Sequence, residues 1–385
     1  MHDKIAWLIK HISFIQWLYR KVMSLVFREM GLFISMDDKL VLLSSYGGDQ
    51  YSDSPKVLFE AMKADPRFDG YHYVWAFGDP SKFDVSGAEK IKIDTLSYFK
   101  TALRAKLWIT NVNIERGLHF KKDSQVYLNT WHGTGPKKGG NAVKGRKDYD
   151  FSYVDIVCVD GKYARDKMVN WFNAKDEHLL YSGRPREDAL YTFTHDDTKR
   201  LRSAFKIPDD KKILLYMPTW REYGNLEINT ELWEKELSNE YIMLVRTHHF
   251  AKRGISVSRG GFWIDASSHP DVNELYWIAD ILISDYSSAF FDYGLLGKPM
   301  VCFGYDYEKY EAGNGFFMDL KNEFPSGIKR TEVDVIKFIK SMDYQAESNR
   351  CKAYVDSYVS HPGNATQMCI DRIYEILCQR HGKKQ

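Results

Sequence analysis

A histidine followed by glycines is the first segment of this chain whose residue types could carry chemistry. The segment runs from Trp131 to Gly140 and directly follows a short apolar run, Val126 to Thr130, which predicts a strand. Histidine titrates near neutral pH, so His132 at the strand end is a candidate general base. The glycines after it let backbone N–H groups approach an anion. The alternative is a structural turn in which the histidine is incidental.

A second polar segment, Pro218 to Arg221, follows the predicted strand Lys212 to Met217. Arg221 could pair with a phosphate, and Trp220 could stack on a nucleotide base. The alternative is a loop tryptophan that fills an interface between domains.

A third segment, Arg246 to His249, ends the predicted strand Ile242 to Val245. Neighbouring side chains of a strand point to opposite faces, so at most one of His248 and His249 should enter a cleft while the strand continues. A hydrogen-bonded structural histidine is the alternative.

A fourth segment combines a buried strand, Ile281 to Ser284, with a helix that Ser287 or Ser288 can cap. The start of such a helix presents free N–H groups and a positive dipole end, which together suit a phosphate. Asp292 lies four residues after Ser288, on the same helix face, where it could hold a hydroxyl group. The alternative is an ordinary helix cap without a ligand.

A basic cluster lies within and after the first segment. These side chains suit an acidic polymeric acceptor or anionic lipid headgroups, and a solvated surface is the alternative. The cluster consists of Lys137, Lys138, Lys144, Arg146 and Lys147.

The composition narrows the class of protein. A chain of 385 residues favours two domains, and a net charge of +2 argues against a general nucleic-acid binder. The five cysteines are odd in number and include no CxxC pair, so we expect reduced thiols in a cytoplasmic protein. No metal-binding motif and no apolar run long enough for a spanning helix stands out.

The N-terminal segment predicts an amphipathic helix. From Ile5 to Phe27 it mixes tryptophans and aliphatic residues with Lys10, Arg20 and Lys21. Such a helix is suited to a membrane interface, and packing on the chain's own domain is the alternative.

The elements that must position these segments alternate between strands and helices. Further strands are expected at Lys39–Ser45, Tyr71–Phe77, Leu107–Thr110, Ile156–Val159 and Met300–Phe303. A helix should begin at Lys56, after Pro55. The alternation predicts an α/β fold with parallel sheets, and polar motifs after strands then share the carboxyl edges where ligands bind.

Together, these segments resemble the CDP-glycerol glycerophosphotransferase family of teichoic-acid and capsule synthesis. The resemblance is carried by WHGT, PTWR, RTHH and DVNELYWIADILISDYSSAFFDYGLLGKP, in that order, and runs from about Ser44 to Gly327. SYGGDQYSDSPK, the run Gly183–Asp188 and the pair Gly315-Phe316 belong to it. The chain departs from the family pattern at Gly135 and His249, where the family usually has proline nearby.

The resemblance implies a GT-B-like pair of Rossmann-type domains facing a cleft. We expect an amphipathic helix over 1–35, an acceptor domain with the catalytic histidine over 36–205, a CDP-donor domain over 206–345, and terminal helices over 346–385 that can cross back. The boundary between the two domains is placed in the polar, charged stretch from His195 to Lys212. His132 corresponds to the family's catalytic base and His248 to its second active-site histidine. The implied donor contacts are Trp131, Gly133, Thr134, Gly135, Arg186, Thr219, Trp220, Arg221, Arg246, Thr247, Ser287, Ser288 and Asp292.

The expected reaction is a direct displacement at phosphorus. His132 would take a proton from a lipid-linked or polymeric acceptor hydroxyl, and the oxygen would attack the CDP-linked polyol phosphate, most simply glycerol phosphate, and release CMP. No cofactor is expected, a metal requirement is left open, and we expect a peripheral protein at the cytoplasmic face of the membrane. The alternatives are a ribitol phosphate donor, a GT-B glycosyltransferase using a nucleotide sugar, or an inactive nucleotide-binding protein.

Overall fold

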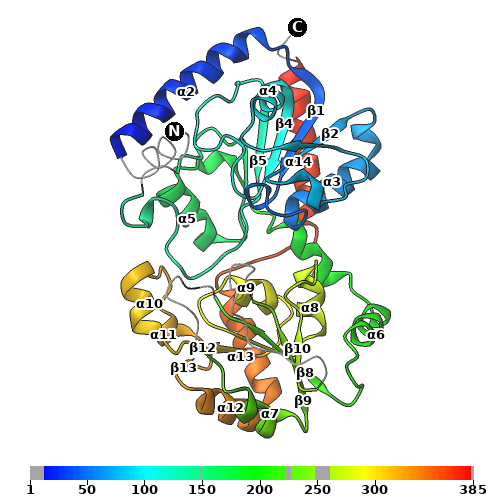
Figure 1. Cartoon of the computed structure of the whole chain (residues 1–385), viewed down its shortest axis with the longest axis vertical. Helices are drawn as coiled ribbons and strands as arrows, with labels where there is room; N and C mark the ends of the chain where they lie inside the picture. The colour runs from blue at the N-terminus through cyan, green and yellow to red at the C-terminus, as the bar shows by residue number, and fades with distance from the viewer. Residues whose placement is uncertain (1–12, 147–148, 220, 222–226, 248–260, 383–385) are drawn as a thin grey trace.

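The chain folds into two β-sheets of parallel strands, each covered by helices (Figure 1). The computed structural model describes residues 13–146, 149–219, 221, 227–247 and 261–382. The arrangement confirms the expected α/β, GT-B-like architecture. The two sheets lie one above the other in Figure 1, and the chain crosses between them twice.

The first sheet contains seven strands in the order β3-β2-β1-β4-β5-β6-β7, and all its neighbouring strands are parallel. Successive residues of β1 enter two different cores, since Leu42 packs on one face of the sheet and Val41 and Leu43 on the other. The strands are β1 Asp37–Ser44, β2 His72–Phe77, β3 Glu89–Lys92, β4 Ala105–Thr110, β5 Val126–Asn129, β6 Ile156–Cys158 and β7 Leu179–Leu180.

The second sheet contains six parallel strands in the order β10-β9-β8-β11-β12-β13. Its central strands are continuous apolar runs, as expected where both faces are covered. The strands are β8 Lys212–Met217, β9 Tyr241–Val245, β10 Trp263–Asp265, β11 Ile281–Ser284, β12 Met300–Phe303 and β13 Ile328–Lys329.

Most helices connect consecutive strands. The helices of the first half are α2 Ser13–Phe33, which precedes β1, and α3 Asp53–Ala64, α4 Leu96–Arg104 and α5 Lys162–Phe172, with short 3₁₀ turns η1 Tyr46–Gly48 and η6 Pro185–Tyr191. The remaining helices are α6 His195–Ala204, α7 Thr230–Leu237, α8 Val272–Ile278, α9 Ala289–Gly294, α10 Tyr307–Asn314, α11 Leu320–Glu323, α12 Glu332–Ser341, α13 Tyr344–Asp356 and α14 Ala365–Gly382.

The last helix returns to the first sheet. Cys369, Ile370 and Ile373 of α14 lie in the same buried core as β1 and β4. Asp188 of η6 accepts from the backbone N–H groups of Ala365 and Thr366 at 2.9 and 2.8 Å, so the first half caps the start of α14. By contrast, α13 packs in the core of the second half.

The position of α6 differs from the predicted domain boundary. The prediction assigns residues up to 205 to the first domain, but Leu201 of α6 lies in the core of the second sheet. Trp277 of α8 also donates to the Thr198 hydroxyl at 2.8 Å. The polar composition of this segment suggested a linker, whereas its one apolar face is buried against α8. A further difference is that α3 begins at Asp53, three residues before the predicted start.

The helix α2 packs on the first half along one side only. Phe27 is buried, and its ring lies 4.2 Å from that of Phe99 and 5.6 Å from that of Phe120. The rest of the helix leaves large apolar side chains exposed, among them Phe14, Trp17, Leu18, Val22 and Leu25. Among the residues that the structure describes, every helix is too short or too polar to cross a bilayer.

Candidate active site

The polar loops of both halves lie at the carboxyl edges of their sheets. Because all strands are parallel, residues that follow β1, β4, β5 and β7 gather at one edge, and residues that follow β8, β9, β11 and β12 gather at another. Contacts between the two sets of loops show that these edges face each other, and the candidate site lies where they meet.

His132 is held by a strained turn directly after β5. Trp131 has a left-handed backbone, with φ of 53°, and its N–H donates to the Asn129 side chain at 2.9 Å. The Trp131 ring packs 4.6 Å from Phe172 and lies 4.1 Å from the His132 ring. Trp131 thereby supports His132 from the first-domain core, and its predicted donor contact stays a prediction.

One hydrogen bond determines the tautomer of the neutral His132 ring. Its Nδ1 lies 2.9 Å from the backbone carbonyl of Asn111, and a carbonyl can only accept, so Nδ1 carries the proton. Nε2 is then left with its lone pair. Burial lowers the pKa of His132, because the imidazolium ion loses hydration. A neutral imidazole with an unprotonated Nε2 is the form that a general base requires.

Asn111 positions a second residue of this edge. Its side-chain oxygen accepts from the Tyr46 N–H at 2.8 Å, while its backbone carbonyl holds His132. Tyr46 is itself in a left-handed conformation, with φ of 48°, and its hydroxyl donates to Asp53 at 2.6 Å. Sequence reasoning missed Asn111, although its place directly after β4 puts it at the ligand-binding edge.

Arg186 connects the two halves through buried ion pairs. Its guanidinium contacts Asp53 of the first half at 2.5 Å and Asp292 of the second half at 2.8 Å, and it donates to the His132 carbonyl at 3.2 Å. Burial alone would raise the pKa of Asp53, but the charge of Arg186 and the hydrogen bonds bring it below its ordinary value. The donor contacts predicted for Arg186 and Asp292 stay predictions, since here each residue holds the other.

A second buried network lies behind the glycine loop. The Thr134 hydroxyl lies 2.8 and 2.7 Å from the two carboxylate oxygens of Asp160, and Arg184 donates to Thr134 at 2.7 Å and also contacts Asp160. Thr134, predicted as a donor contact, is 2 % exposed and thus supports the loop from within. Arg184 entered the resemblance only as part of the run Gly183–Asp188, and the structure buries it with Thr134 and Asp160.

The second-half loops are organised by two carboxylates that sequence reasoning missed. Asp285 accepts from the Thr219 N–H at 3.0 Å and pairs with Arg221 at 2.8 Å. Asp306 contacts the Arg221 Nε at 2.5 Å. Arg221 is fully enclosed by these groups and by the rings of Tyr286 and Tyr305. Arg221 therefore supports these loops through its ion pairs with Asp285 and Asp306. Its predicted contact with a phosphate stays a prediction.

The serine pair and the glycine loop touch across the seam. A Cβ placed on Gly133 would lie 2.7 Å from the Ser288 Oγ, and one on Gly135 would lie 3.4 Å from the Ser288 Cβ. Ser287 accepts from the Ala289 N–H at 3.1 Å and so begins α9, which is six residues long. His132 and the Ser287-Ser288 turn therefore belong to one site.

Arg246 and Thr247 complete the second-half edge. Arg246 donates to the carbonyls of Ala266 and His269 at 3.3 and 2.6 Å, and no described carboxylate forms an ion pair with it. The Thr247 N–H donates to the Ser267 hydroxyl at 3.0 Å. The predicted residues Trp220, His248 and Lys147 lie outside the described residues.

The basic cluster divides into two groups. Lys138, Lys144 and Arg146 are exposed, and the Arg146 guanidinium lies 5.2 Å from the Tyr149 ring centre. Lys137 is instead half-buried at the contact between the two halves, where it pairs with Phe316 in an isolated β-bridge. The cluster is thus not one continuous surface.

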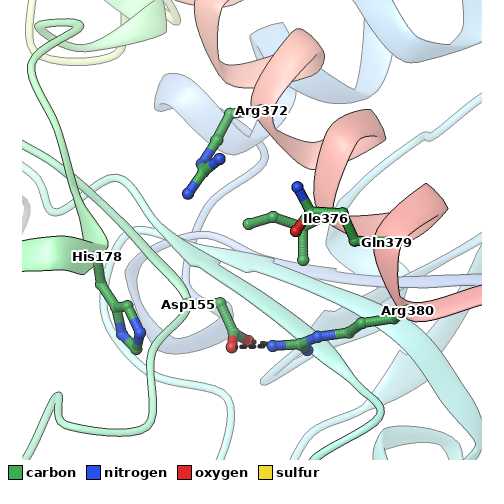
Figure 2. A pocket seen from close by; sticks show the side chains of 6 residues that line it. All are labelled: Asp155, His178, Arg372, Ile376, Gln379 and Arg380. Atoms are coloured by element: carbon green, nitrogen blue, oxygen red, sulfur yellow. Dashed lines mark hydrogen bonds and ion pairs between the residues drawn. The ribbon is translucent and has the colours of Figure 1, made fainter. Parts of the chain in front are cut away.

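A cavity of about 220 Å³ lies elsewhere in the first half (Figure 2). Asp155, which precedes β6, forms an ion pair with Arg380 of α14 there, and His178 and Arg372 also line the space. Residues that precede strands lie at the amino edge of the sheet, opposite the edge that carries His132, so this cavity is not part of the site.

Comparison with known proteins decides the family. The family model described as CDP-Glycerol:Poly(glycerophosphate) glycerophosphotransferase matches residues 26–375. The chain belongs to this family. The family resemblance drawn from the motifs is thereby confirmed.

Proteins similar to this glycerophosphotransferase include teichoic-acid polymerases and a transferase. The chain is 32 % identical to a teichoic acid poly(glycerol phosphate) polymerase of Staphylococcus epidermidis over 88 % of its own length, and it spans 51 % of that protein. It is 29 % identical to the polymerase of that name in Bacillus spizizenii, over 97 % of this chain and all of the other. A teichoic acid glycerol-phosphate transferase of Staphylococcus aureus is 29 % identical over 80 % of this chain and 85 % of the transferase.

Solved structures extend the comparison to the fold. The wall teichoic acid polymerase TagF, in a histidine-to-asparagine variant, superposes with a TM-score of 0.82 and 30 % identity, covering 94 % of each chain. The same variant has also been solved after a soak with CDPG. The likeness covers both halves of the chain, so the seam between the two sheets belongs to the shared fold.

Proposed function

We propose that this chain transfers a glycerol phosphate unit from CDP-glycerol to a hydroxyl group of a lipid-linked or polymeric teichoic-acid acceptor. The observation that carries the proposal is the contact between the His132 loop and the Ser288 turn, because it places a neutral imidazole beside the polar loops of the other sheet. Membership of the glycerophosphotransferase family supports the donor and the reaction class.

The proposed reaction is a single displacement. Nε2 of His132 takes the proton of the acceptor hydroxyl, and the oxygen forms a bond to the phosphorus that carries the glycerol. The bond from this phosphorus to the bridging oxygen breaks, and CMP leaves with that oxygen and its electron pair. Arg246 supplies positive charge for the diphosphate, since it has no carboxylate partner among the described residues. The Ser287-Ser288 turn contributes hydroxyl and backbone donors.

CMP release tests this function. Purified protein is incubated with a glycerol-phosphate-primed acceptor and CDP-glycerol, CDP-ribitol or a nucleotide sugar, and the released nucleotide is identified by chromatography. We expect CMP and an extended acceptor with CDP-glycerol. Release of a nucleoside diphosphate from a nucleotide sugar would instead assign the chain to the glycosyltransferases, and preferential use of CDP-ribitol would replace glycerol by ribitol as the polyol.

We also propose that the reaction needs no cofactor and no divalent metal. The positive charge offered by the arginine and lysine side chains at the seam supports this proposal, because cationic side chains can neutralise a diphosphate without a metal. Turnover should survive incubation with EDTA, and full loss that Mg²⁺ restores would contradict the proposal.

We further propose that the chain attaches peripherally to the cytoplasmic face of the membrane. The exposed apolar side chains of α2 suit a lipid interface, and Lys138, Lys144 and Arg146 suit anionic headgroups. All five cysteines are free thiols, which fits a reducing compartment. Sedimentation with vesicles that contain phosphatidylglycerol tests the attachment, and a protein that stays in the supernatant at low salt would contradict it.

A further inference from the structure

Lys137 lies at the seam because the backbones of the two halves pair there. The Lys138 N–H donates to the Gly315 carbonyl at 3.1 Å, and the Phe317 N–H donates to the Pro136 carbonyl at 2.7 Å. Between these two hydrogen bonds, Lys137 lies opposite Phe316 in an antiparallel bridge. The backbone of Lys137 is therefore held by the second half of the chain, although it belongs to a loop of the first.

This bridge separates the two neighbouring lysines. Side chains alternate along an extended segment, so Lys137 and Lys138 point to opposite sides. Lys138 is exposed, and its stem lies over Gly315. Lys137 is half-buried. The two lysines thus share one backbone geometry and differ in whether the ammonium group lies at the seam or in solvent.

The Lys137 ammonium lies near one carboxylate and one guanidinium. Burial lowers the pKa of Lys137; the Asp285 carboxylate opposes this shift, and the charge of Arg221 adds to it. Asp285 already pairs with Arg221 and accepts from Thr219. A second ammonium, that of Lys167, donates to the Gly135 carbonyl at 3.0 Å, and burial, with repulsion from Arg184 and Lys137, lowers its pKa to about 8.

No described residue accepts a hydrogen bond from the Lys137 ammonium or forms an ion pair with it. A partly desolvated charge without a partner is unfavourable in the free protein, and an anionic ligand that reaches it regains that free energy on binding. The same loop carries Gly133 and Gly135, which touch Ser288. Asp285, whose charge acts on the Lys137 ammonium, precedes Ser287 by two residues, so an anion bound at the serine turn would lie near this lysine.

We propose that Lys137 is a donor-binding residue, whose ammonium contacts the diphosphate of the nucleotide donor. This assignment rests on the proposed function and replaces the role that the sequence suggested for Lys137, contact with the acceptor or with lipid headgroups. The lysine holds the two phosphates in position and neutralises the charge that builds up on the departing nucleotide. Lys138, Lys144 and Arg146 remain as the exposed part of the basic cluster.

Nucleotide affinity tests the proposal, with Lys138→Met as the matched control for Lys137→Met. We expect Lys137→Met to weaken the binding of CDP by about 10- to 100-fold, the range for loss of one hydrogen bond to a charged group. Cytidine, which has no phosphate, should bind both variants as it binds the wild type. Lys137→Arg should recover part of the CDP affinity. Unchanged CDP affinity in Lys137→Met, or an equal loss for cytidine, would overturn the proposal.

Kinetics and stability separate this role from the alternatives. The KM for CDP-glycerol should rise in Lys137→Met, while the KM for the acceptor and the sedimentation with vesicles stay unchanged. The reverse pattern would show that Lys137 contacts the acceptor or lipid headgroups instead. The thermal unfolding midpoint should stay level or rise, because an unpaired half-buried charge is removed, whereas a purely structural lysine would lower it. Wild-type protein that binds another nucleoside diphosphate in place of CDP would contradict the proposed donor alone, and a Lys137→Met loss of affinity for that nucleotide would still support this inference.

Discussion

The assignment of His132 as the general base depends on one hydrogen bond to a backbone carbonyl. Because the Asn111 carbonyl can only accept, it places a proton on Nδ1, and burial favours the neutral ring, in which Nε2 is then unprotonated. We expect His132→Ala to lose about 10²- to 10⁴-fold in turnover while CDP affinity stays within a few-fold of the wild type. Steady-state CMP release and calorimetric CDP binding measure the two quantities.

A matched histidine provides the control. His178 also places Nδ1 against a backbone carbonyl, that of Val154 at 2.6 Å, but lies at the amino edge of the sheet. His178→Ala should therefore leave turnover unchanged. Full activity in His132→Ala, or an equal loss in both variants, would remove His132 as the base.

The pH dependence follows from the direction of the His132 pKa. Burial lowers this pKa below the ordinary value of 6.5, so the neutral base should predominate above that pH. The kcat/KM for CDP-glycerol should rise as pH increases through the lowered pKa and should be level by neutral pH. A kcat/KM that still increases above pH 7 would indicate a base with a higher pKa.

Arg186 carries a different prediction at the same scale, on stability. Its partners Asp53 and Asp292 are almost fully buried, so Arg186→Met would leave two carboxylates without their counter-charge. The free energy of unfolding should fall by about 3–5 kcal/mol in urea titrations. Arg165→Met removes solvent-screened surface pairs with Asp166 and Asp176 and should lower the free energy of unfolding far less. A loss in Arg186→Met as small as in this control would show that the network adds nothing to stability.

At the scale of the element, α2 has one face that packs and one that does not. We expect Leu18→Glu combined with Leu25→Glu to release the protein from phosphatidylglycerol vesicles, because both side chains are exposed and their burial in lipid would be lost. The far-UV spectrum and the thermal midpoint should not change. Sedimentation with vesicles at several salt concentrations measures the effect.

Two further variants show whether α2 itself is responsible. Val333→Glu changes an exposed apolar side chain of the second half and should bind vesicles as the wild type does. Phe27→Ala removes a buried ring from the packed face and should cost about 3–5 kcal/mol of stability without abolishing attachment. Vesicle binding that survives both α2 glutamates would place the membrane contact on another element.

At the scale of the whole molecule, the glycine loop is one of the places where the two halves touch. Gly133 has φ of 148°, and a Cβ there would collide with Ser288. We expect Gly133→Ala to separate the two edges and to reduce turnover about 10²-fold, the cost of misplacing reacting groups by roughly 1 Å. Initial rates of CMP release measure it.

Gly145→Ala is the control for this steric effect. Gly145 also has positive φ, at 83°, but open space surrounds the position of its Cβ. The variant should lose about 1 kcal/mol of stability from backbone strain and keep its activity. Equal activity in Gly133→Ala and Gly145→Ala would mean that the contact with Ser288 does not position the site.

Much of the fold could be predicted because continuous apolar runs identify buried strands. Lys212–Met217, Ile281–Ser284 and Met300–Phe303 were predicted with the bounds that the structure shows. The strands missed were short or at sheet edges, namely β3, β7, β10 and β13, where a few residues leave no periodic signal. The helix α6 was missed for a related reason, since its polar surface hides its one buried leucine.

By itself, the sequence determined which residues follow strands, and parallel strands bring all such residues to a common edge. His132, Ser287 and Ser288 were predicted as site residues in this way. Only the tertiary structure decided which polar side chain meets which partner, because these pairings join residues far apart in the chain, such as Arg186 and Asp53, separated by 133 positions. Local spacing cannot distinguish an arginine held by two carboxylates from one free for a phosphate, or the half-buried Lys137 from the exposed Lys138 beside it.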